Sequence, residues 1–202
     1  SRYAVDENWL VPHFEKMLYD NIQFILLLGK FLKVQSNDYF LKKVKQTTNF
    51  IKTKFLSKEI KLLGSAFDAD SEGEEGKYYV YNYEELKNIK NIERFFDVKP
   101  GGNWEGKIIL DELKEPSEEI IAHLLKIRRK RKEPFFDKKN QLDLNCLWVS
   151  SLITLNSIIP GENYLKAAEN FYEKIEKKFC AKNIFHSYSE NISFIDDYAY
   201  LI

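Results

Sequence analysis

The sequence predicts a mainly α-helical protein built from helical hairpins, with a small β excursion between them. Long segments of the 202-residue chain place apolar residues three or four positions apart, which is the spacing of one helix face. Short polar links join these segments in pairs, as in αα-hairpins. Near the middle, Gly and acidic residues interrupt the pattern before a short run of Tyr and Val, which is typical of a loop followed by a strand.

The first two predicted helices form a hairpin. Pro12 stands at the first position of a helix whose apolar face runs through residues 14–32. Asn37 or Asp38 caps a second helix over residues 40–55. Two long helices with a short polar link between them predict an αα-hairpin.

The β excursion occupies the middle of the chain. Residues 64–76, GSAFDADSEGEEG, break the helical pattern, and residues 78–81 are predicted as a short strand. A short helix is predicted over residues 83–90. The Gly-rich residues 99–106 are predicted as a loop that leads to the apolar residues 108–110.

Helices resume in the last part of the chain. Ser117, followed by two Glu residues, is typical of a helix start, and Pro134 ends that segment. Residues 144–159 and 164–179 predict a second αα-hairpin, and the last residues predict the beginning of a further helix. No low-complexity tract or linker divides the chain, so residues 1–202 are predicted as a single unit that is incomplete at both ends.

Composition excludes several classes of protein. Hydrophobic residues make up 44% of the chain and aromatic residues 15%. That content supports a core burying roughly 70% of the unfolded surface, which excludes intrinsic disorder. Because 31 Lys plus Arg balance 31 Asp plus Glu, we expect no nucleic-acid partner. The longest apolar run, residues 24–28, is far shorter than the ~18 residues that span a bilayer, so we expect no membrane partner.

The two cysteines, Cys146 and Cys180, are too far apart for a CxxC pair and too few for a secreted disulfide scaffold. We therefore expect two buried thiols in a cytoplasmic protein.

The first helix carries the first candidate site. His13, Lys16 and Asp20 fall on one stripe of that predicted helix, and Glu15 lies on the neighbouring flank. An imidazole, an ammonium and a carboxylate on one stripe suit acid–base chemistry. The alternative is a surface stripe with an ordinary Lys16–Asp20 pair, because charge pairs four residues apart are commonplace in helices.

The acidic segment DADSEGEE is the second candidate. Asp68, Asp70 and Glu72 alternate before Gly73, which is the opening of an EF-hand calcium loop. The match fails at its twelfth position, where Tyr79 stands in place of a bidentate Glu. A different hard-cation site, carboxylates that bond sugar hydroxyls, and a solvated loop remain as alternatives.

The third candidate combines an aromatic residue with planar hydrogen-bonding groups. Trp104 is flanked by Asn103 and Glu105, as in carbohydrate sites, and the segment lacks the spacing of a phosphate-binding loop. Residues 126–132, KIRRKRK, are the only basic cluster. They are typical of cations at a helix C-terminus, and an anion or RNA contact is the alternative.

Near the end of the chain, Asp196 and Asp197 stand where carboxylates cap a helix. His123 and His186 have no metal-ligand spacing to a partner, and we interpret both as structural.

Together these segments resemble the spermatogenesis-associated protein 20 family, in which a thioredoxin-like domain precedes a helical toroid of the six-hairpin glycosidase type. The resemblance rests on motifs that occur in family order along nearly the whole chain. They are RYAVDENWLVPHFEKMLYDN at residues 2–21, DADSEGEEGKYYVYNYEEL at 68–86, GNWEGKIIL at 102–110, Arg128 and Arg131 with Pro134 and Asp137, and DDYA at 196–199.

The resemblance implies a partial α/α toroid. The chain corresponds to about half a ring and lacks the thioredoxin-like domain. Its open edge predicts self-association, because exposed apolar faces promote it. In the segment FDKKNQLDLNCL the family typically has Asp, Trp and Gly where this chain has Lys138, Leu144 and Cys146, while Asp137 and Asn145 match.

The function that this resemblance implies is that of a carbohydrate-active or carbohydrate-binding domain, similar to sugar epimerases and glycoside hydrolases. In an epimerase-like enzyme, His13 is the general acid–base, oriented by Asp20 or Glu15, and Arg128 or Arg131 stabilises an anionic intermediate. In a hydrolase, two carboxylates flank the scissile bond roughly 5 to 9.5 Å apart. The alternative is a non-catalytic interaction module, or a degenerate remnant of a protein that contains a thioredoxin domain.

The residues expected to form the site follow from these arguments. The predicted catalytic residues are His13, Glu15, Asp20, Asp68, Asp70, Glu105 and Asp197. The predicted substrate-binding residues are Lys16, Asn21, Asn103, Trp104, Arg128, Arg131, Asn145 and Tyr198. We expect a small-molecule sugar as partner, no metal and no cofactor.

Overall fold

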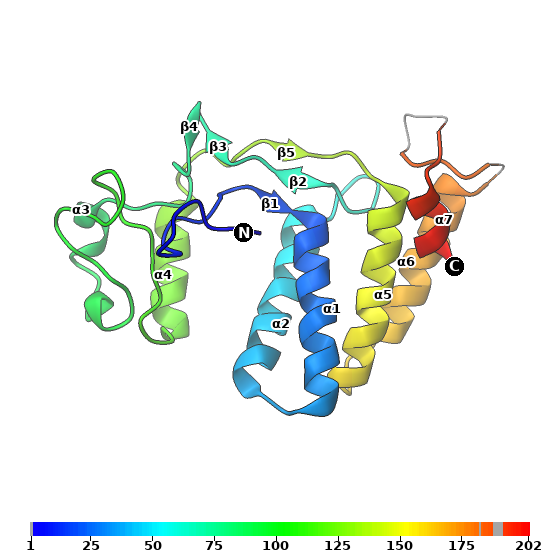
Figure 1. Ribbon diagram of the computed structural model, residues 1–202, viewed down its shortest axis with the longest axis horizontal. Coiled ribbons are helices and arrows are strands. Elements are labelled where there is room, and N and C mark those ends of the chain that lie inside the picture. Colours follow the sequence, from blue (N-terminus) through cyan, green and yellow to red (C-terminus); the bar gives the residue numbers. More distant parts are fainter. Residues whose placement is uncertain (1, 182, 188–191) are drawn as a thin grey trace. The chain divides into compact units, whose positions relative to one another are not determined.

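The structure is a computed structural model that describes residues 2–181, 183–187 and 192–202 (Figure 1). Contacts within the chain group into two compact units. Unit 1 contains residues 2–15 and Phe67–Phe135, and unit 2 contains Lys16–Ala66 and Phe136–Ile202. That residues 1–202 fold as a single domain stays a prediction.

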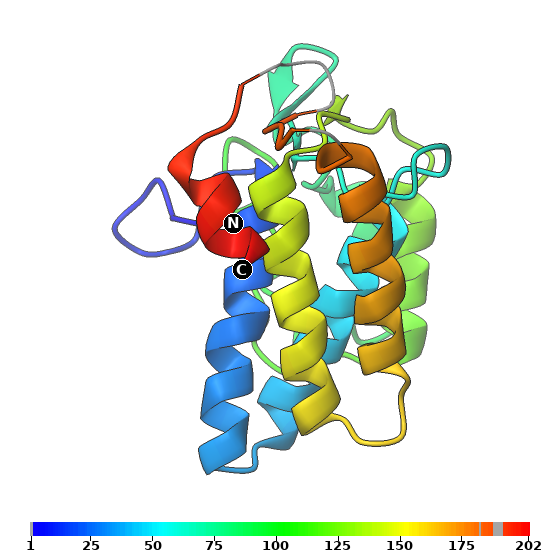
Figure 2. The same ribbon diagram turned by 90° about the vertical axis from the view of Figure 1, so that its right-hand side faces the viewer.

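Unit 2 is built from helices that pair as hairpins. Its helical elements are α1 (Leu18–Val34), α2 (Asp38–Phe50), the π-helical turn η1 (Ile51–Phe55), α5 (Leu142–Ile158), α6 (Tyr164–Phe179) and α7 (Ile195–Leu201). Helix α1 packs against α2 and α5, and α5 packs against α6 and α7 (Figure 2). The prediction of a mainly α protein with two αα-hairpins is confirmed.

Close packing between α1 and α5 depends on a glycine. A Cβ at Gly29 of α1 would lie 2.4 Å from Cγ2 of Thr154 on α5, so only a glycine lets the two helices approach at this point. Helix α1 buries Leu18, Ile22 and Ile25 completely. Burying such aliphatic side chains stabilises the unit by about 1.5–3 kcal/mol each.

Helix α1 begins later than the sequence predicts. Pro12 pairs antiparallel with Ala4, and the His13 N–H donates to the Tyr3 carbonyl at 3.1 Å. This hairpin holds residues 12–15 in extended conformation, so the helix starts only at Leu18. The prediction that Pro12 is the first helical residue was therefore wrong.

A short three-stranded sheet has the order β1-β2-β5. Its strands are β1 (Lys16–Met17), β2 (Ala66–Phe67) and β5 (Phe136–Asp137). All of these residues belong to unit 2 except Phe67, where the chain passes into unit 1.

Unit 1 contains a β-hairpin, short helical turns and one longer helix. Its elements are β3 (Asp70–Ser71), β4 (Glu74–Glu75), α3 (Tyr83–Leu86), the 3-10 turn η2 (Ile92–Arg94) and α4 (Glu118–Arg128). Strands β3 and β4 pair antiparallel through a two-residue turn. The φ angles of 58° at Glu72 and 78° at Gly73 are those of a type I′ turn, in which glycine is favoured.

The predicted strand over residues 78–81 is absent from the structure. The amide groups of Tyr79 and Val80 both donate to the Gly76 carbonyl, so the backbone turns here instead of extending. Only Tyr81 pairs as a strand residue would, with Ile108. The predicted strand was therefore wrong, and β3–β4 is the hairpin of this region.

Two apolar clusters form the core of unit 1. One includes Tyr81, Leu86 and Leu124, and the other packs Phe14 and Val80 with their neighbours. Within the part of the chain that the structure describes, no helix has the length and apolarity needed to cross a membrane.

Both cysteines are free. Cys146 is buried as predicted, whereas Cys180 is only half-buried. The prediction of two buried thiols is thus confirmed for Cys146 and wrong for Cys180, which directly follows the last residue of α6.

Candidate acid–base site

An imidazole between two carboxylates forms the candidate site of unit 1. His13 Nε2 lies 3.4 Å from Glu15 Oε2, and His13 Nδ1 lies 3.6 Å from Glu75 Oε1. The Tyr3 ring stacks on the imidazole with centroids 4.8 Å apart and planes 10° from parallel. Arg2 Nη2 binds Glu15 Oε2 at 2.7 Å. One histidine is thus oriented on three sides by side chains of unit 1.

The extended backbone explains why these residues meet. Alternate side chains of an extended segment point to opposite faces, so His13 and Glu15 share one face while Phe14 enters the core. Glu75 comes from β4, and Gly76 directly after it has a φ of +71°. A Cβ at Gly76 would lie 2.6 Å from the Phe14 ring. Glycine here lets β4 approach the His13 segment closely.

The loop before His13 is held by one carboxylate. Asp6 accepts hydrogen bonds from the backbone N–H groups of Val11, Asn8 and Leu10 at 2.6, 3.0 and 3.3 Å. The Val11 amide, with the other two, lowers the pKa of the Asp6 carboxyl. Trp9 at the tip of the loop has a φ of 59° and is 82% exposed. The loop therefore has a defined shape, which fixes the segment that carries His13.

Proton transfer is the chemistry that this geometry suits. The His13 side chain is 20% exposed, so a ligand can reach the ring. Glu15 and Glu75 hold the ring between them, and an imidazole nitrogen can accept a proton from a bound substrate or donate one to it.

The other acidic residues predicted for the site lie apart from His13. Asp68 and Asp70 are exposed at the β3–β4 hairpin, where Asp68 Oδ1 accepts from the Asp70 N–H at 3.3 Å. Glu105 is exposed in a tight turn with a φ of 47°. Among the residues of unit 1 that the structure describes, the carboxylates within ion-pair distance of His13 belong to Glu15 and Glu75.

The Gly-rich loop is confirmed as a loop, and its side chains have internal partners. The Asn103 side chain bonds both backbone groups of Ile109, donating at 2.9 Å and accepting at 2.8 Å. Trp104 is half-buried and packs on Phe14 with ring centroids 5.5 Å apart. Their predicted part in substrate binding stays a prediction.

The two arginines hold the turn that replaces the predicted strand. Arg131 Nη2 donates to both carboxylate oxygens of Glu85 at 2.9 Å, and Nη1 donates to the carbonyls of Tyr78, at 3.0 Å, and Val80. The Arg128 guanidinium lies 5.8 Å from the centre of the Tyr79 ring. Burial raises the pKa of Tyr79 to about 12.

The predicted helical stripe of His13, Lys16 and Asp20 does not form. His13 and Glu15 precede the helix in unit 1, Lys16 lies in β1, and Asp20 belongs to the first turn of α1. Asn21 follows Asp20 on α1 and donates to the Met17 carbonyl at 2.6 Å. The stripe was an error that followed from placing the start of the helix at Pro12.

Asn145 lies inside unit 2 with no exposed surface. Its Oδ1 accepts from the Leu63 N–H at 2.8 Å, and its Nδ2 donates to the carbonyls of Leu63 at 3.2 Å and Gln141 at 2.7 Å. The amide thus ties the loop before β2 to α5.

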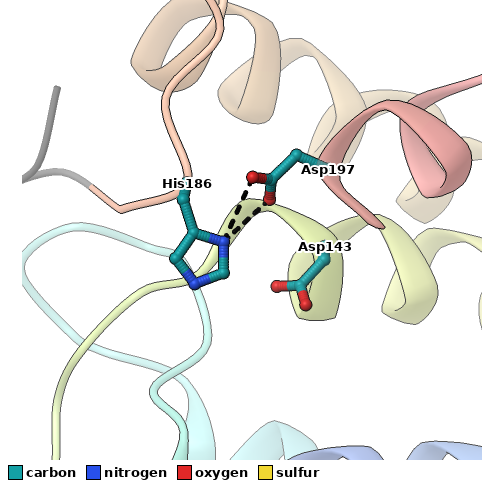
Figure 3. Close-up of side chains that lie close together, drawn as sticks. All are labelled: Asp143, His186 and Asp197. Atoms are coloured by element: carbon teal, nitrogen blue, oxygen red, sulfur yellow. Dashed lines mark hydrogen bonds and ion pairs between the residues drawn. The ribbon is translucent and has the colours of Figure 1, made fainter. Parts of the chain in front are cut away.

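A second cluster in unit 2 joins His186 to Asp197 (Figure 3). His186 Nδ1 lies 2.9 Å from Asp197 Oδ1, and Asp197 also accepts from the Phe194 N–H at 2.8 Å as a helix cap. Gln141 Nε2 lies 2.9 Å from His186 Nε2. His186 Nε2 thus faces the Gln141 amide, and Nδ1 faces Asp197. The sequence predicts that Asp196 or Asp197 caps a helix, and in the structure Asp197 is the capping residue.

Asp143 completes this cluster from the first turn of α5. Burial raises the pKa of Asp143, and the Leu144 N–H and His186 oppose the shift. One ligand atom from each of Asp143, His186 and Asp197 lies within 4.8 Å of the others, which makes them a group that could hold a metal ion. Both carboxylates stand in the first turns of helices, whose free amides favour anions over cations.

Tyr198 lies one residue beyond Asp197. Its hydroxyl is 3.1 Å from Ser193 Oγ, and its side chain is 43% exposed. It is therefore available to a ligand, and its predicted binding role stays a prediction.

Sequence reasoning missed Glu75, Tyr3 and Asp143 as members of these clusters. In the sequence, Glu75 is one of several acidic residues in a loop, and Asp143 belongs to no motif. His186 has no partner at a metal-ligand spacing in the sequence. Each contact joins residues from different elements, so no local pattern signals it.

No family model matches the chain. Over 94 residues, 44% of the chain, it is 33% identical to spermatogenesis-associated protein 20 of Mus musculus and of Homo sapiens. That match spans only 12% of the length of each relative. An uncharacterized protein of Caenorhabditis elegans is 26% identical across 100% of the chain, which covers 36% of that protein. The resemblance to spermatogenesis-associated protein 20 is thus confirmed over part of the chain.

A solved family 76 glycoside hydrolase from a bovine Bacteroides thetaiotaomicron strain is similar over 87% of the chain. The similarity has a TM-score of 0.49 and 12% sequence identity, and it covers 24% of that enzyme's chain.

Proposed function

We propose that this chain is part of a carbohydrate-active domain in which His13 transfers a proton to or from a bound sugar. The single observation that carries the proposal is the imidazole placed between Glu15 and Glu75 at 3.4 and 3.6 Å. An imidazole nitrogen can both accept and donate a proton, which suits a group that must do both during a reaction.

Each neighbour of the imidazole has a defined task in this proposal. Arg2 Nη2 binds Glu15 Oε2 at 2.7 Å and fixes the position of the carboxylate, so that Glu15 can orient the His13 ring. Tyr3 stacks on one face of the ring and fixes its plane. Glu75 lies 3.6 Å from Nδ1 and so contacts the ring at the nitrogen that does not face Glu15.

This arrangement supports proton transfer in an isomerase better than a hydrolase, because the centre of the site is an imidazole and not a pair of carboxylates. A cytoplasmic location belongs to the same proposal, because both thiols are free.

His13→Gln tests the proposal, with His123→Gln as the matched control. His123 lies exposed on α4 of the same unit. Mono- and disaccharides are incubated with each protein, and the products are followed by NMR for epimerised or cleaved sugar. We expect conversion by the native chain and by His123→Gln, and a loss of about 100-fold or more in His13→Gln.

Thermal melts of the three proteins separate loss of function from loss of folding. A folded His13→Gln variant that converts sugar as fast as the native chain would refute the role of His13. A folded native chain that binds sugar without converting it would favour the alternative, a non-catalytic binding module.

A further inference from the structure

Unit 1 contains a polar cavity of about 490 Å³. Five cationic side chains line it: Lys77, Lys107, Lys130, Arg131 and Lys132. Three carboxylates, Glu72, Glu74 and Glu85, also line it. The cavity wall therefore carries a surplus of two positive charges.

The carboxylates are already paired with two of the cations. Lys77 Nζ lies 3.3 Å from Glu74 and 3.5 Å from Glu72. Glu74, by hydrogen bond and charge, and then Glu72 raise the pKa of Lys77 above its usual value. Arg131 is held by Glu85 at 2.9 Å. The other three cations of the cavity, Lys107, Lys130 and Lys132, take no part in these pairs.

Three lysines line the cavity without a carboxylate of their own. Lys107 Nζ donates to Asn82 Oδ1 at 3.0 Å, which is a neutral acceptor. In the part of the chain that the structure describes, no ion pair forms to any of these three lysines, Lys107, Lys130 and Lys132. Their charges are available to a ligand that enters the cavity.

The backbone that carries these lysines is fixed by other contacts. Arg131 is anchored by Glu85 and by backbone carbonyls, which holds Lys130 and Lys132 on either side of it. Ser71 Oγ donates to the Lys132 carbonyl at 2.7 Å and joins the β3–β4 hairpin to this segment. A hydrogen bond of 2.7 Å from the Lys107 N–H to the Trp104 carbonyl closes the turn that carries Lys107.

We propose that this cavity binds a phosphoryl group, carried by a small sugar phosphate or present as free phosphate. Two surplus positive charges match a phosphoryl dianion better than a carboxylate with one charge. The three lysines come from two segments of unit 1, the one after α4 and the loop before Ile108, so they can contact different oxygens of one group.

The cavity and the His13 site share β4. Glu74 lines the cavity, and the next residue, Glu75, contacts His13. Adjacent strand residues point to opposite faces, so β4 separates the two. Identifying the ligand as a sugar phosphate rests on the proposed function, whereas phosphoryl binding itself does not.

Isothermal titration calorimetry at low salt tests the inference with three probes: inorganic phosphate, glucose 6-phosphate and glucose. The double variant Lys130→Gln/Lys132→Gln removes two of the unpaired cations. The double variant Lys114→Gln/Lys126→Gln is the control, because it removes the same charge from exposed positions of unit 1 outside the cavity. Thermal melts check that all three proteins are folded.

We expect both phosphate compounds to bind the native chain and the control, and to bind the cavity variant at least tenfold more weakly. Raising the salt concentration should weaken this binding, because exposed charges are screened. The inference is overturned if phosphate does not bind the native chain, or if both double variants bind it equally.

The outcomes also separate the two proposals. Glucose 6-phosphate that binds without conversion would support the phosphoryl site and contradict the acid–base proposal. Conversion of glucose by a protein that binds no phosphate would support the acid–base proposal and overturn the phosphoryl site.

Discussion

Replacing Asn145 by Ala tests whether its buried amide supports the fold or awaits a substrate. After the change, the Leu63 carbonyl still accepts from Asn140 Nδ2 at 2.8 Å. The Gln141 carbonyl still accepts the backbone N–H of residue 145 at 3.1 Å. Only the Leu63 N–H, in a residue that is 1% exposed, loses its partner.

The free-energy cost of Asn145→Ala follows from this one lost hydrogen bond and from the space that the shorter side chain leaves. A buried donor without a partner costs about 1–3 kcal/mol. The space left by the shortened side chain adds roughly 1 kcal/mol. We therefore expect Asn145→Ala to lower the free energy of unfolding by about 2–4 kcal/mol.

Urea unfolding followed by circular dichroism measures this loss. With a slope of about 2 kcal/mol per molar, the midpoint should fall by roughly 1–2 M while the slope stays constant. Asn140→Ala is the control, because Asn145 Nδ2 still serves the Leu63 carbonyl, at 3.2 Å, and no donor is orphaned. Equal midpoints for the two variants, or an unchanged midpoint with weaker sugar binding in Asn145→Ala, would refute the reasoning.

Three further predictions concern strain and ionisation. Burial raises the pKa of Asp143 above 3.8, so its charge destabilises the folded state at neutral pH. Asp143→Asn should raise Tm at pH 7, and the difference from the native chain should vanish below pH 3.8; equal Tm values at pH 7 would contradict this. Gly76→Ala should cost more than Gly73→Ala in urea unfolding, because its Cβ meets Phe14 whereas that of Gly73 meets nothing within 4 Å. Burial raises the pKa of Cys146 to about 12, so in a Cys180→Ser variant, which removes the half-buried thiol, Cys146 should react with Ellman's reagent only after unfolding; rapid reaction of that folded variant would contradict this.

Local interactions made much of the helical framework predictable. Asn37 accepts from the Phe40 N–H at 2.9 Å and Ser117 caps α4, as the sequence predicts. Helix α6 has the predicted bounds, residues 164–179. Caps and helical faces join residues within about four positions, so their signals are present in short stretches of sequence.

The tertiary structure decided the start of α1, the turn over residues 78–81 and the partners of His13. Propensity favours a helix after Pro12, but pairing with the N-terminal hairpin keeps residues 12–15 extended. Glu75 reaches His13 only because the type I′ turn folds β4 back and Gly76 lets it approach Phe14.

The sequence by itself determined the mainly α class of the protein and the bounds of α6, and it places His13 and Glu15 two positions apart. The second carboxylate at His13, the His186–Asp197 pair and the lysine-lined cavity each join segments that are distant in sequence. Such contacts depend on which surfaces are buried together and on where the backbone reverses direction, and the free energy of burial is a property of the whole fold.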